Sequence, residues 1–378
     1  MEKVADLVSI SREHPAIRED AGKKIARMRE WIKPRGLSGV ILARADNFAW
    51  LTAGGDSRII ESSETGVAVL VITAARQYLV AYRMDATRLL EEQLPGQGYE
   101  LVWLHWFEGD PLQKAMELVD GPTGADVVLP GTEYIQSELI DLHYPMTPLE
   151  VERYRWLGEE TGDLMNRMAG WVQPGMTELE IAHEMRAEHA RRSLDVDVLI
   201  VGSDARVFQF RHPMATHKPL ENYLLIHSAA RRWGLHANVS RCISFGKPPA
   251  RLARAWEAAA TLEGRLISRL EAGLPFAKIL QWQKEWYADL GFPEEWKYHF
   301  QGGPTGYVVV DPVRCLTEKV VQVNQPFEWF ITITGVKAGE LTFLFPSGSE
   351  ILSMRPEWPE FHVQIPDKTI KVPGLFMR

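Results

Sequence analysis

The stretch LLIHSAARRWGLHANVSRCISFG (224–246) decides the fold of this chain, because it contains two runs, LLIHSAA and HANVSRCISFG, that read as strands. Apolar and β-branched residues bounded by turn residues are typical of strands. We expect His227 and Asn238 to be neighbours on this strand pair, and His236 to point to the face opposite Asn238. Polar side chains on neighbouring strands make the pair a candidate site.

The segments around these strands predict long helices with clear start signals. Thr147-Pro148 with Glu150 forms a capping box with proline in the first turn. The apolar residues of the helix that follows keep a helical period up to QPGMT (173–177). Thr177 and Glu180 open a second helix. Two more helices are predicted over 249–270 and 277–291, and the rest of the chain is strand-rich.

The residues before about 145 read as a separate α/β domain. A helix with apolar residues at helical spacing ends at Gly36. Strands and helices then alternate, which predicts a mixed sheet covered by helices. The predicted strands are 37–43, 65–72, 77–82 and 100–106, and the predicted helices are 84–94 and 111–119. We therefore expect two domains, 1–145 and 146–378.

Composition excludes several classes of protein. A chain of 378 residues with 46% hydrophobic and 24% charged residues is that of a folded protein long enough for two domains. A net charge of −8 opposes binding to nucleic acid, which requires a basic surface. No segment has the roughly 20 apolar residues of a membrane span. Cys242 and Cys315 make neither a disulfide framework nor a zinc signature, so we expect a cytoplasmic protein.

Five segments of the chain resemble the creatinase and proline-aminopeptidase (Xaa-Pro peptidase) superfamily. The resemblance implies an α+β protein, with an N-terminal creatinase-like α/β domain followed by a C-terminal domain of the pita-bread fold. It also implies a homodimer. The segments are 146–185, 198–213, 224–246, 298–307 and 333–352.

The resemblance also places the metal ligands of the superfamily. In its metal-dependent members, carboxylates bridge two ions that activate a water between them. The five ligand positions fall on His227, Asn238, Gly303, Thr334 and Glu340. Only Glu340 is anionic, so we expect neither a dinuclear centre nor another cofactor. A single ion held by His227, His236 and Glu340 is the alternative, because imidazole suits zinc, iron or copper.

Two histidines outside the ligand positions are candidate catalytic residues. His212, in FRHP, matches the histidine that creatinase, which lacks metals, uses as its proton shuttle. His299 and Gln301 precede a glycine turn in a run that resembles a metal-lacking branch with the pattern Trp-x-x-His-x-Gln-Gly-Gly-x-x-Gly-Tyr. A structural role is the alternative for both histidines.

Other residues are weighed as acids, bases or substrate contacts. Glu340 and Asp311 are the carboxylates expected near the site, and a buried carboxylate can have a raised pKa. Trp329 and Phe330 should wall an aromatic pocket, and Arg241 is expected to anchor a carboxylate. The metal-lacking branch has Asn-Pro where this chain has Phe330-Ile331 and Arg-Glu where it has Val310-Asp311. The predicted catalytic residues are His212, Glu340, Asp311, His227 and His299, and the predicted substrate contacts are Trp329, Phe330, Gln301, Asn238, Arg241, His236 and Trp50.

Trp50 lies in DNFAWLTAGGDSRI (46–59), which resembles a loop that reaches the partner subunit's active site in creatinase-like dimers. Asn47 and Arg58 are weaker candidates there, and an ordinary turn after the strand 37–43 is the alternative.

The leading functional hypothesis is a metal-independent enzyme that hydrolyses a C–N bond in a small polar, amino-acid-like or guanidino molecule. His212 would shuttle protons, and Glu340 and Asp311 would orient a cationic group. A biosynthetic enzyme that runs elimination, cyclisation or isomerisation in the same pocket is the second hypothesis. A non-catalytic binding module is the third.

Overall fold

The computed structural model describes residues 10–366 and 368–378, and within it the chain forms two compact units. The first unit comprises the residues up to Arg153 together with Trp233–Leu235. The second comprises Tyr154–Arg232 and His236–Arg378. The division falls inside helix α7 (Pro148–Trp171), eight residues beyond the predicted boundary at 145.

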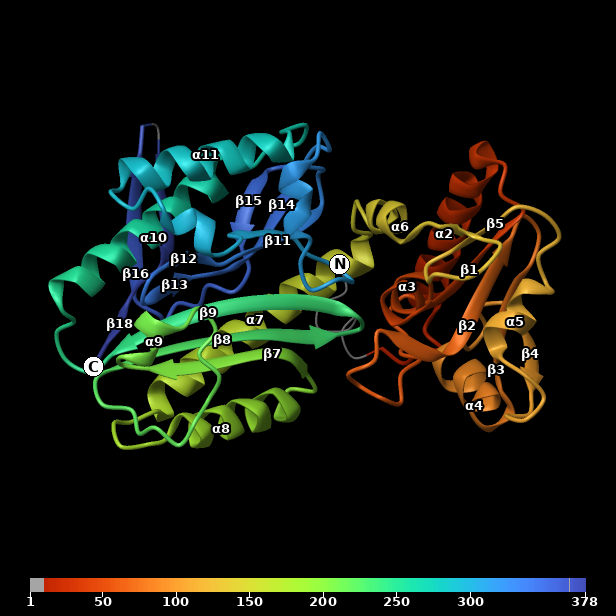
Figure 1. The fold of residues 1–378 in the computed structure, drawn as a ribbon, viewed down its shortest axis with the longest axis horizontal. Helices are drawn as coiled ribbons and strands as arrows, with labels where there is room; N and C mark the ends of the chain where they lie inside the picture. Colours follow the sequence, from red (N-terminus) through yellow and green to blue (C-terminus); the bar gives the residue numbers. More distant parts are fainter. Residues whose placement is uncertain (1–9, 367) are drawn as a thin grey trace. The chain divides into compact units, whose positions relative to one another are not determined.

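The first unit is a mixed sheet with helices packed against it, as the alternating pattern predicts (Figure 1). Its strand order is β4-β3-β2-β1-β5-β6, with β1–β2 and β2–β3 antiparallel and the outer pairs parallel. The strands are β1 Gly39–Arg44, β2 Thr65–Thr73, β3 Gln77–Tyr82, β4 Glu100–Leu104, β5 Thr123–Ala125 and β6 Glu133–Tyr134. The helices are α2 Pro15–Ile32, α3 Ala45–Leu51, α4 Arg83–Arg88, α5 Pro111–Met116 and α6 Gln136–Leu142, with a π-helical turn at Leu89–Gln93 and a 3-10 turn at Lys33–Arg35.

Local sequence signals account for the ends of these elements. Gly36 adopts φ +67° after the first helix, which is the left-handed conformation that favours glycine at a helix end. The segment after β1 differs from the expected loop or turn, because Ala45–Leu51 forms helix α3. Asn47 and Trp50 are buried in this helix, while Arg58 lies beyond it.

The second unit is built on a sheet of order β18-β9-β8-β7, beside smaller sheets. The two strands predicted within 224–246 are β8 and β9, and they are neighbours as expected. The strands are β7 Asp195–Ser203, β8 Tyr223–Arg232, β9 Leu235–Ser244, β10 Gly302–Pro304, β11 Gln325–Trp329, β12 Ile331–Ile333, β13 Val336–Ala338, β14 Leu341–Phe345, β15 Gly348–Ile351, β16 Glu360–Ile365, β17 Lys368–Pro373 and β18 Phe376–Met377.

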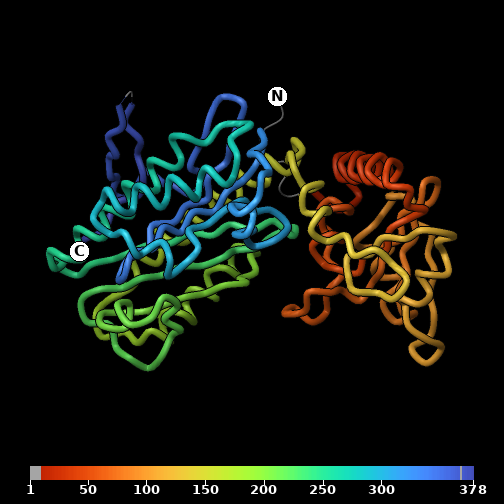
Figure 2. The backbone as a smooth tube through the Cα atoms, turned by 45° about the horizontal axis from the view of Figure 1, so that its top comes forward, coloured from red at the N-terminus to blue at the C-terminus, as the bar shows by residue number. Residues whose placement is uncertain are grey.

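Two layers of helices enclose these sheets. Helices α8 and α10 lie on opposite sides of the β7–β9 sheet in both views (Figures 1 and 2). The helices are α7, α8 Glu178–Arg191, α9 Arg206–Gln209, α10 Ala250–Arg269 and α11 Phe276–Asp289, with 3-10 turns at Glu295–Tyr298 and Pro312–Leu316. Apolar residues of α7 and α8 pack on one face of the sheet, and those of α10 and α11 pack in a second core with β11 to β14. The capping boxes predicted at Thr147 and Thr177 are both formed.

Cys242 and Cys315 are free and buried, in agreement with the expectation of no disulfide. Within residues 10–366 and 368–378, no helix is long and apolar enough to cross a bilayer.

Candidate active site

Two histidines from distant parts of the chain form a hydrogen-bonded pair in the second unit. The Nε2 atoms of His212 and His299 lie 2.9 Å apart, and the two rings are nearly perpendicular, at 81°. His212 is in the loop after α9, and His299 follows the 3-10 turn Glu295–Tyr298. The structure therefore brings together the two candidate histidines that lie outside the ligand positions.

Hydrogen bonding indicates which histidine donates in the pair. His299 Nδ1 contacts the backbone carbonyl oxygen of Phe300, which only accepts, so Nδ1 carries the proton. In neutral His299 the Nε2 atom then accepts a hydrogen bond from Nε2–H of His212. Burial, together with the charge of Lys337, lowers the pKa of His299 to about 4, so this neutral form persists at physiological pH. Burial and Lys337 also lower the pKa of His212.

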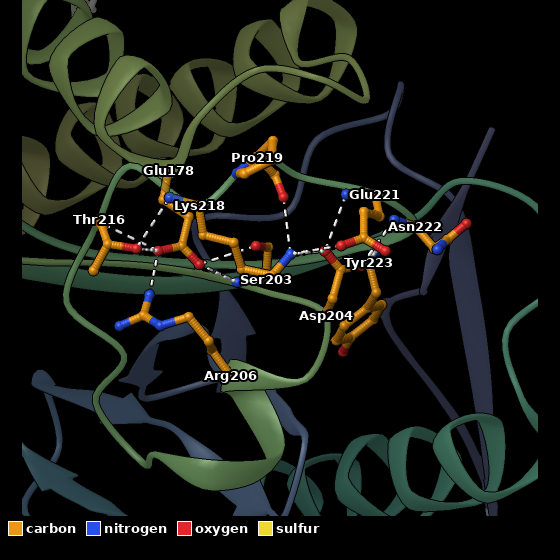
Figure 3. Close-up of polar contacts among 10 residues, drawn as sticks. All are labelled: Glu178, Ser203, Asp204, Arg206, Thr216, Lys218, Pro219, Glu221, Asn222 and Tyr223. Carbon is orange, nitrogen blue, oxygen red and sulfur yellow. Dashed lines mark hydrogen bonds and ion pairs between the residues drawn. The ribbon is translucent and has the colours of Figure 1, made fainter.

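The loop that carries His212 is tied down at both ends by two carboxylates, of Glu178 and Asp204 (Figure 3). Glu178, at the start of α8, accepts hydrogen bonds from N and Oγ of Ser203 at 2.8 and 2.9 Å. It also accepts from N and Oγ1 of Thr216 at 3.0 and 2.9 Å, and it forms an ion pair with Arg206. Residues on both sides of His212 are thus fixed to one side chain.

Asp204 makes a second clamp beside the first. Its carboxylate accepts from the backbone N–H groups of Glu221, Asn222 and Tyr223 at 2.8–2.9 Å, and from Lys218 Nζ at 2.7 Å (Figure 3). Burial opposes the charge, but the hydrogen bonds from Lys218 and the backbone lower the pKa of Asp204 overall. Both clamps hold the segment that contains His212.

Gln301 positions the other histidine. Its Oε1 accepts hydrogen bonds from the Tyr287 hydroxyl at 2.5 Å and from the backbone N–H of Thr332 at 2.9 Å. Its Nε2 donates to the backbone carbonyl oxygen of His299. Gln301 is 3% exposed, and its amide forms hydrogen bonds within the protein that connect His299 to α11 and β12.

His227 completes a cluster of imidazoles. It is buried on β8, and its Nδ1 lies 2.9 Å from Ser240 Oγ on β9. Burial, with the charges of Lys337, His212 and His299, holds the pKa of His227 well below its usual value. The side chain is therefore neutral and acts as a hydrogen-bonding group at neutral pH.

Lys337 lies at the same cluster, and the sequence analysis did not identify it. The residue is on β13, is 2% exposed, and lies close enough to lower the pKa of His212, His227 and His299. Its ammonium group has no hydrogen-bond or ion-pair partner within residues 10–366 and 368–378. Burial, with the charge of Arg211, lowers the pKa of Lys337 to about 8. Its place between Val336 and Ala338 in a short strand reads as an ordinary outward-facing lysine, so the sequence carries no signal of its burial.

Phe330 forms the wall that these groups share. Its ring centroid lies 6.1 Å from that of His227, 5.6 Å from that of His299 and 5.5 Å from Lys337 Nζ. The neighbouring Trp329 stacks on Phe327 at 5.5 Å in the core. Of the two predicted wall residues, Phe330 faces the cluster and Trp329 packs in the core.

Arg211 and Glu295 lie beside the cluster, and both form hydrogen bonds with Thr334, one of the expected ligand positions. Thr334 Oγ1 donates to Glu295 at 2.7 Å and accepts from Arg211 at 2.9 Å, while Arg211 and Glu295 form an ion pair. Gly335 follows Thr334 with φ +96°, and a Cβ there would lie 2.5 Å from the ring of Phe208. Glycine is therefore required in the turn that leads to Lys337.

Glu340, the one carboxylate retained at the ligand positions, is bound to other protein groups. It is 1% exposed and forms an ion pair with Arg241. Ser353 Oγ donates to it at 2.5 Å. Burial raises the pKa of Glu340, although Arg241 and Ser353 act in the opposite direction. Burial and the charge of Glu340 together hold the pKa of Glu263 well above its usual value.

A second buried carboxyl group, Glu328, lies near the remaining ligand positions. Its Oε1 accepts from Thr305 Oγ1 at 2.9 Å and from the backbone N–H of Asn238 at 3.1 Å. Gly303 is paired with it across strands β10 and β11. Burial raises the pKa of Glu328 well above its usual value. The Asn238 amide donates to the Val309 carbonyl oxygen at 3.5 Å.

His236 and Asp311 are engaged in contacts within the protein. His236 Nδ1 lies 2.9 Å from the Gly306 carbonyl oxygen, and its Nε2 lies 2.9 Å from Asp197. The expectation that His236 and Asn238 face opposite ways was wrong, because residues two apart on a strand share a face. Both side chains bond to carbonyl oxygens of the segment 306–309. Asp311 accepts from Arg314 Nε at 2.8 Å.

Trp50 belongs to the first unit. Its ring centroid lies 5.1 Å from that of His143, and both residues are fully buried. Asn47 hydrogen-bonds to Asp126 and Gln136 at 2.9 and 2.7 Å, and Arg58 pairs with Asp56. These contacts give the three residues structural partners within that unit.

The residues at the five ligand positions do not fit a dinuclear metal centre. Two divalent ions require several anionic oxygens that converge on one point. Here the only carboxylate, Glu340, is paired with Arg241, while Thr334 and Asn238 hydrogen-bond to protein groups. The single-ion alternative also fails, because His227, His236 and Glu340 are directed to Ser240, Asp197 and Arg241. Throughout the described part of the chain, no group of three His, Cys, Asp or Glu residues could hold an ion.

Comparisons with known proteins agree with this architecture. Residues 152–322 match the model of metallopeptidase family M24. A Xaa-Pro dipeptidase from Bacillus anthracis has a similar structure, with a TM-score of 0.74 and 16% identity over 95% of this chain and 100% of that one. Dipeptidase PepE from Mycobacterium ulcerans has a TM-score of 0.77 and 17% identity, over 95% of this chain and 98% of that one. The prolidase from Pyrococcus horikoshii has a TM-score of 0.74 and 16% identity, over 88% of this chain and 98% of that one. No curated protein matches in sequence. These structures share the fold of this chain, an α/β unit followed by a pita-bread unit, and residues 152–322 resemble family M24.

Proposed function

We propose that this protein is a metal-independent hydrolase that cleaves a C–N bond in a small, amino-acid-like molecule. The match to a metallopeptidase family and the prolidase-like neighbours support a hydrolase of peptidase type. The observation that carries the proposal is the 2.9 Å contact between His212 and His299, which supplies an acid–base pair.

The tautomers assigned to the pair suggest how it works. His212 donates its Nε2 proton to His299, which leaves Nδ1 of His212 unprotonated and able to accept a proton from a water molecule. The water attacks the carbon of the C–N bond, and His212 then delivers the proton to the leaving nitrogen. His299 stays neutral and holds the imidazole of His212 in orientation, as the partner of a general base commonly does.

The charges around the cluster favour an anionic over a cationic substrate group. Glu340 and Asp311, once expected to hold a cation, are paired with Arg241 and Arg314. Lys337 and Arg211 are the nearby charges instead, and Arg211 is neutralised by Glu295. We therefore favour substrates that carry a carboxylate over guanidino compounds without one. Dimerisation and a cytoplasmic location stay predictions.

The test is a substrate panel assayed with chelator and with added divalent ions. Dipeptides, amino-acid amides and guanidino acids are incubated with the wild type and with His212→Ala and His299→Ala. His217→Ala is the matched control, because His217 is exposed in the same loop. We expect turnover that chelator does not affect, a loss of at least about 100-fold in His212→Ala, and no loss in the control. Turnover only with added metal, or equal activity of His212→Ala and His217→Ala, would contradict the proposal.

Non-hydrolytic chemistry is the second candidate, and one observation favours it. Lys337 offers a buried amine within the imidazole cluster, and peptide hydrolysis by the histidine pair does not need an amine nucleophile.

A further inference from the structure

Lys337 occupies an unusual setting for a lysine. Buried ammonium groups are ordinarily paired with a carboxylate or hydrogen-bonded, because removing the charge from water is costly. Within residues 10–366 and 368–378, no side chain or carbonyl group is paired with Lys337 Nζ. The amine lies over the face of Phe330, at 5.5 Å from the ring centroid. The fold therefore holds the amine without neutralising it.

The groups around Lys337 are those that proton transfer to and from an amine adduct requires. His227 and His299 lie against the same phenylalanine ring at 6.1 and 5.6 Å between centroids, and His212 is hydrogen-bonded to His299. All three imidazoles respond to the charge of Lys337. His212 is exposed and His299 is partly exposed, so the imidazole pair is open to solvent on its outer side.

We propose that Lys337 is a nucleophilic amine that captures a small aldehyde or ketone as an imine at this site. The lone pair of Nζ attacks the carbonyl carbon to give a carbinolamine, and the nitrogen loses a proton. A neutral imidazole of the cluster accepts that proton and passes it to the carbinolamine hydroxyl, which leaves as one water molecule, so that a C=N bond joins substrate and lysine. The sum is carbonyl plus amine to imine plus water, with no oxidant or reductant. This activity goes beyond the proposed hydrolysis and does not rest on it.

The amine is chemically suited to this step, since only the neutral form attacks carbonyl groups. With a pKa of about 8, Lys337 is roughly 25% neutral at pH 7.5, compared with about 0.1% for an ordinary lysine. Desolvated lysines next to other cationic groups are the general pattern for Schiff-base formation.

Borohydride trapping tests the proposal on the full-length protein. The protein is incubated with pyruvate or, separately, with propionaldehyde at pH 7.5, and sodium borohydride then reduces any imine to a stable secondary amine. Peptide mass spectrometry quantifies the adduct at each lysine. We expect Lys337 to be labelled at least about tenfold faster than Lys247, which is exposed. Labelling by pyruvate alone would restrict the carbonyl compounds that Lys337 captures to 2-oxo acids. Labelling by both compounds would indicate that Lys337 captures carbonyl compounds in general.

Variants separate reactivity from charge and folding. Lys337→Arg keeps the positive charge but cannot form an imine, and Lys247→Met is the matched control. We expect the selective adduct to disappear in Lys337→Arg, to persist in Lys247→Met and to lose its selectivity when the wild type is unfolded in urea. The site-by-site comparison within the wild type needs no variant to fold. Equal labelling of Lys337 and Lys247, or no adduct at Lys337, overturns the proposal, and neither result bears on the His212-dependent hydrolysis.

Discussion

Arg241 and Glu340 form an ion pair inside the second unit, where both side chains are at most 3% exposed. Glu340 is the only carboxylate at the five expected ligand positions, and this pair neutralises its charge. With the hydrogen bond from Ser353, the pair makes Glu340 part of a buried polar core.

We expect Arg241→Met to destabilise the protein strongly. The substitution leaves Glu340 buried without its partner, and breaking a buried pair from one side typically costs about 3–5 kcal/mol. Urea unfolding at pH 7 measures the loss. Glu340→Gln, which removes the charge and keeps the shape, should cost less and should leave kcat of any detected activity within a few-fold. A large drop in kcat with unchanged stability would instead support the catalytic role first expected for Glu340.

Acid should destabilise the protein through the imidazole cluster. The pKa values of His227 and His299 are lower in the folded protein than in the unfolded chain, where they are near 6.5. As pH falls from about 6.5 toward 4, the unfolded chain binds protons that the folded protein does not. Stability is therefore lost over this window, by up to about 1.4 kcal/mol per pH unit for each group. The urea midpoint of His299→Gln should fall less steeply than that of the wild type between pH 7 and 5, and parallel curves would contradict this.

Lys337→Met should raise stability at neutral pH. The pKa of Lys337 is about 8 in the folded protein and 10.5 in the unfolded chain. Between pH 8 and 10.5 the protein therefore takes up a proton when it unfolds. Wild-type stability therefore rises with pH from about 8 to 10.5, and the burial penalty is fully present below pH 8. The variant should gain up to about 3 kcal/mol at pH 7 and lack this rise. Cys242, whose pKa burial raises, is present in both proteins.

Glu178→Gln should loosen the loop that carries His212. The amide keeps the size of the side chain, but it cannot accept all the hydrogen bonds of the carboxylate and leaves Arg206 without its ion-pair partner. Faster hydrogen exchange over residues 204–220 and a fall of about 1–3 kcal/mol in stability are expected. Glu221→Gln is the control, because Glu221 is exposed and uses mainly its backbone N–H in the clamp. Equal exchange in the two variants would show that the clamp does not hold the loop.

Local patterns predicted much of the fold. Capping boxes at Thr147 and Thr177 fix helix starts through bonds between residues three apart, and such short-range signals can be read directly. The strand pair around His227 and Asn238 is likewise read from apolar and β-branched runs bounded by turn residues. Helix α3 was missed because it is short and its N-cap residue, Arg44, makes no side-chain cap hydrogen bond.

The candidate site was less predictable because its contacts are long-range. His212 and His299 are 87 residues apart, and their pairing depends on two separate loops. Both histidines were identified as candidates, but nothing in the sequence indicated that they contact each other. Lys337 was missed since its burial results from the packing of β13 beside Phe330, and a single lysine between small apolar residues is typical of an exposed strand.

The paired carboxylates of Glu178 and Asp204 also have an evolutionary consequence. They tie the segment between Ser203 and Tyr223 to the helix and sheet at its two ends. Val207 and Leu220 pack in the core near these ends, while Phe208, Phe210 and His212 in the middle are exposed. Exposed central residues such as the one at 212 can be exchanged without disturbing the framework, so a fold built this way can change its chemistry while its scaffold keeps folding as before.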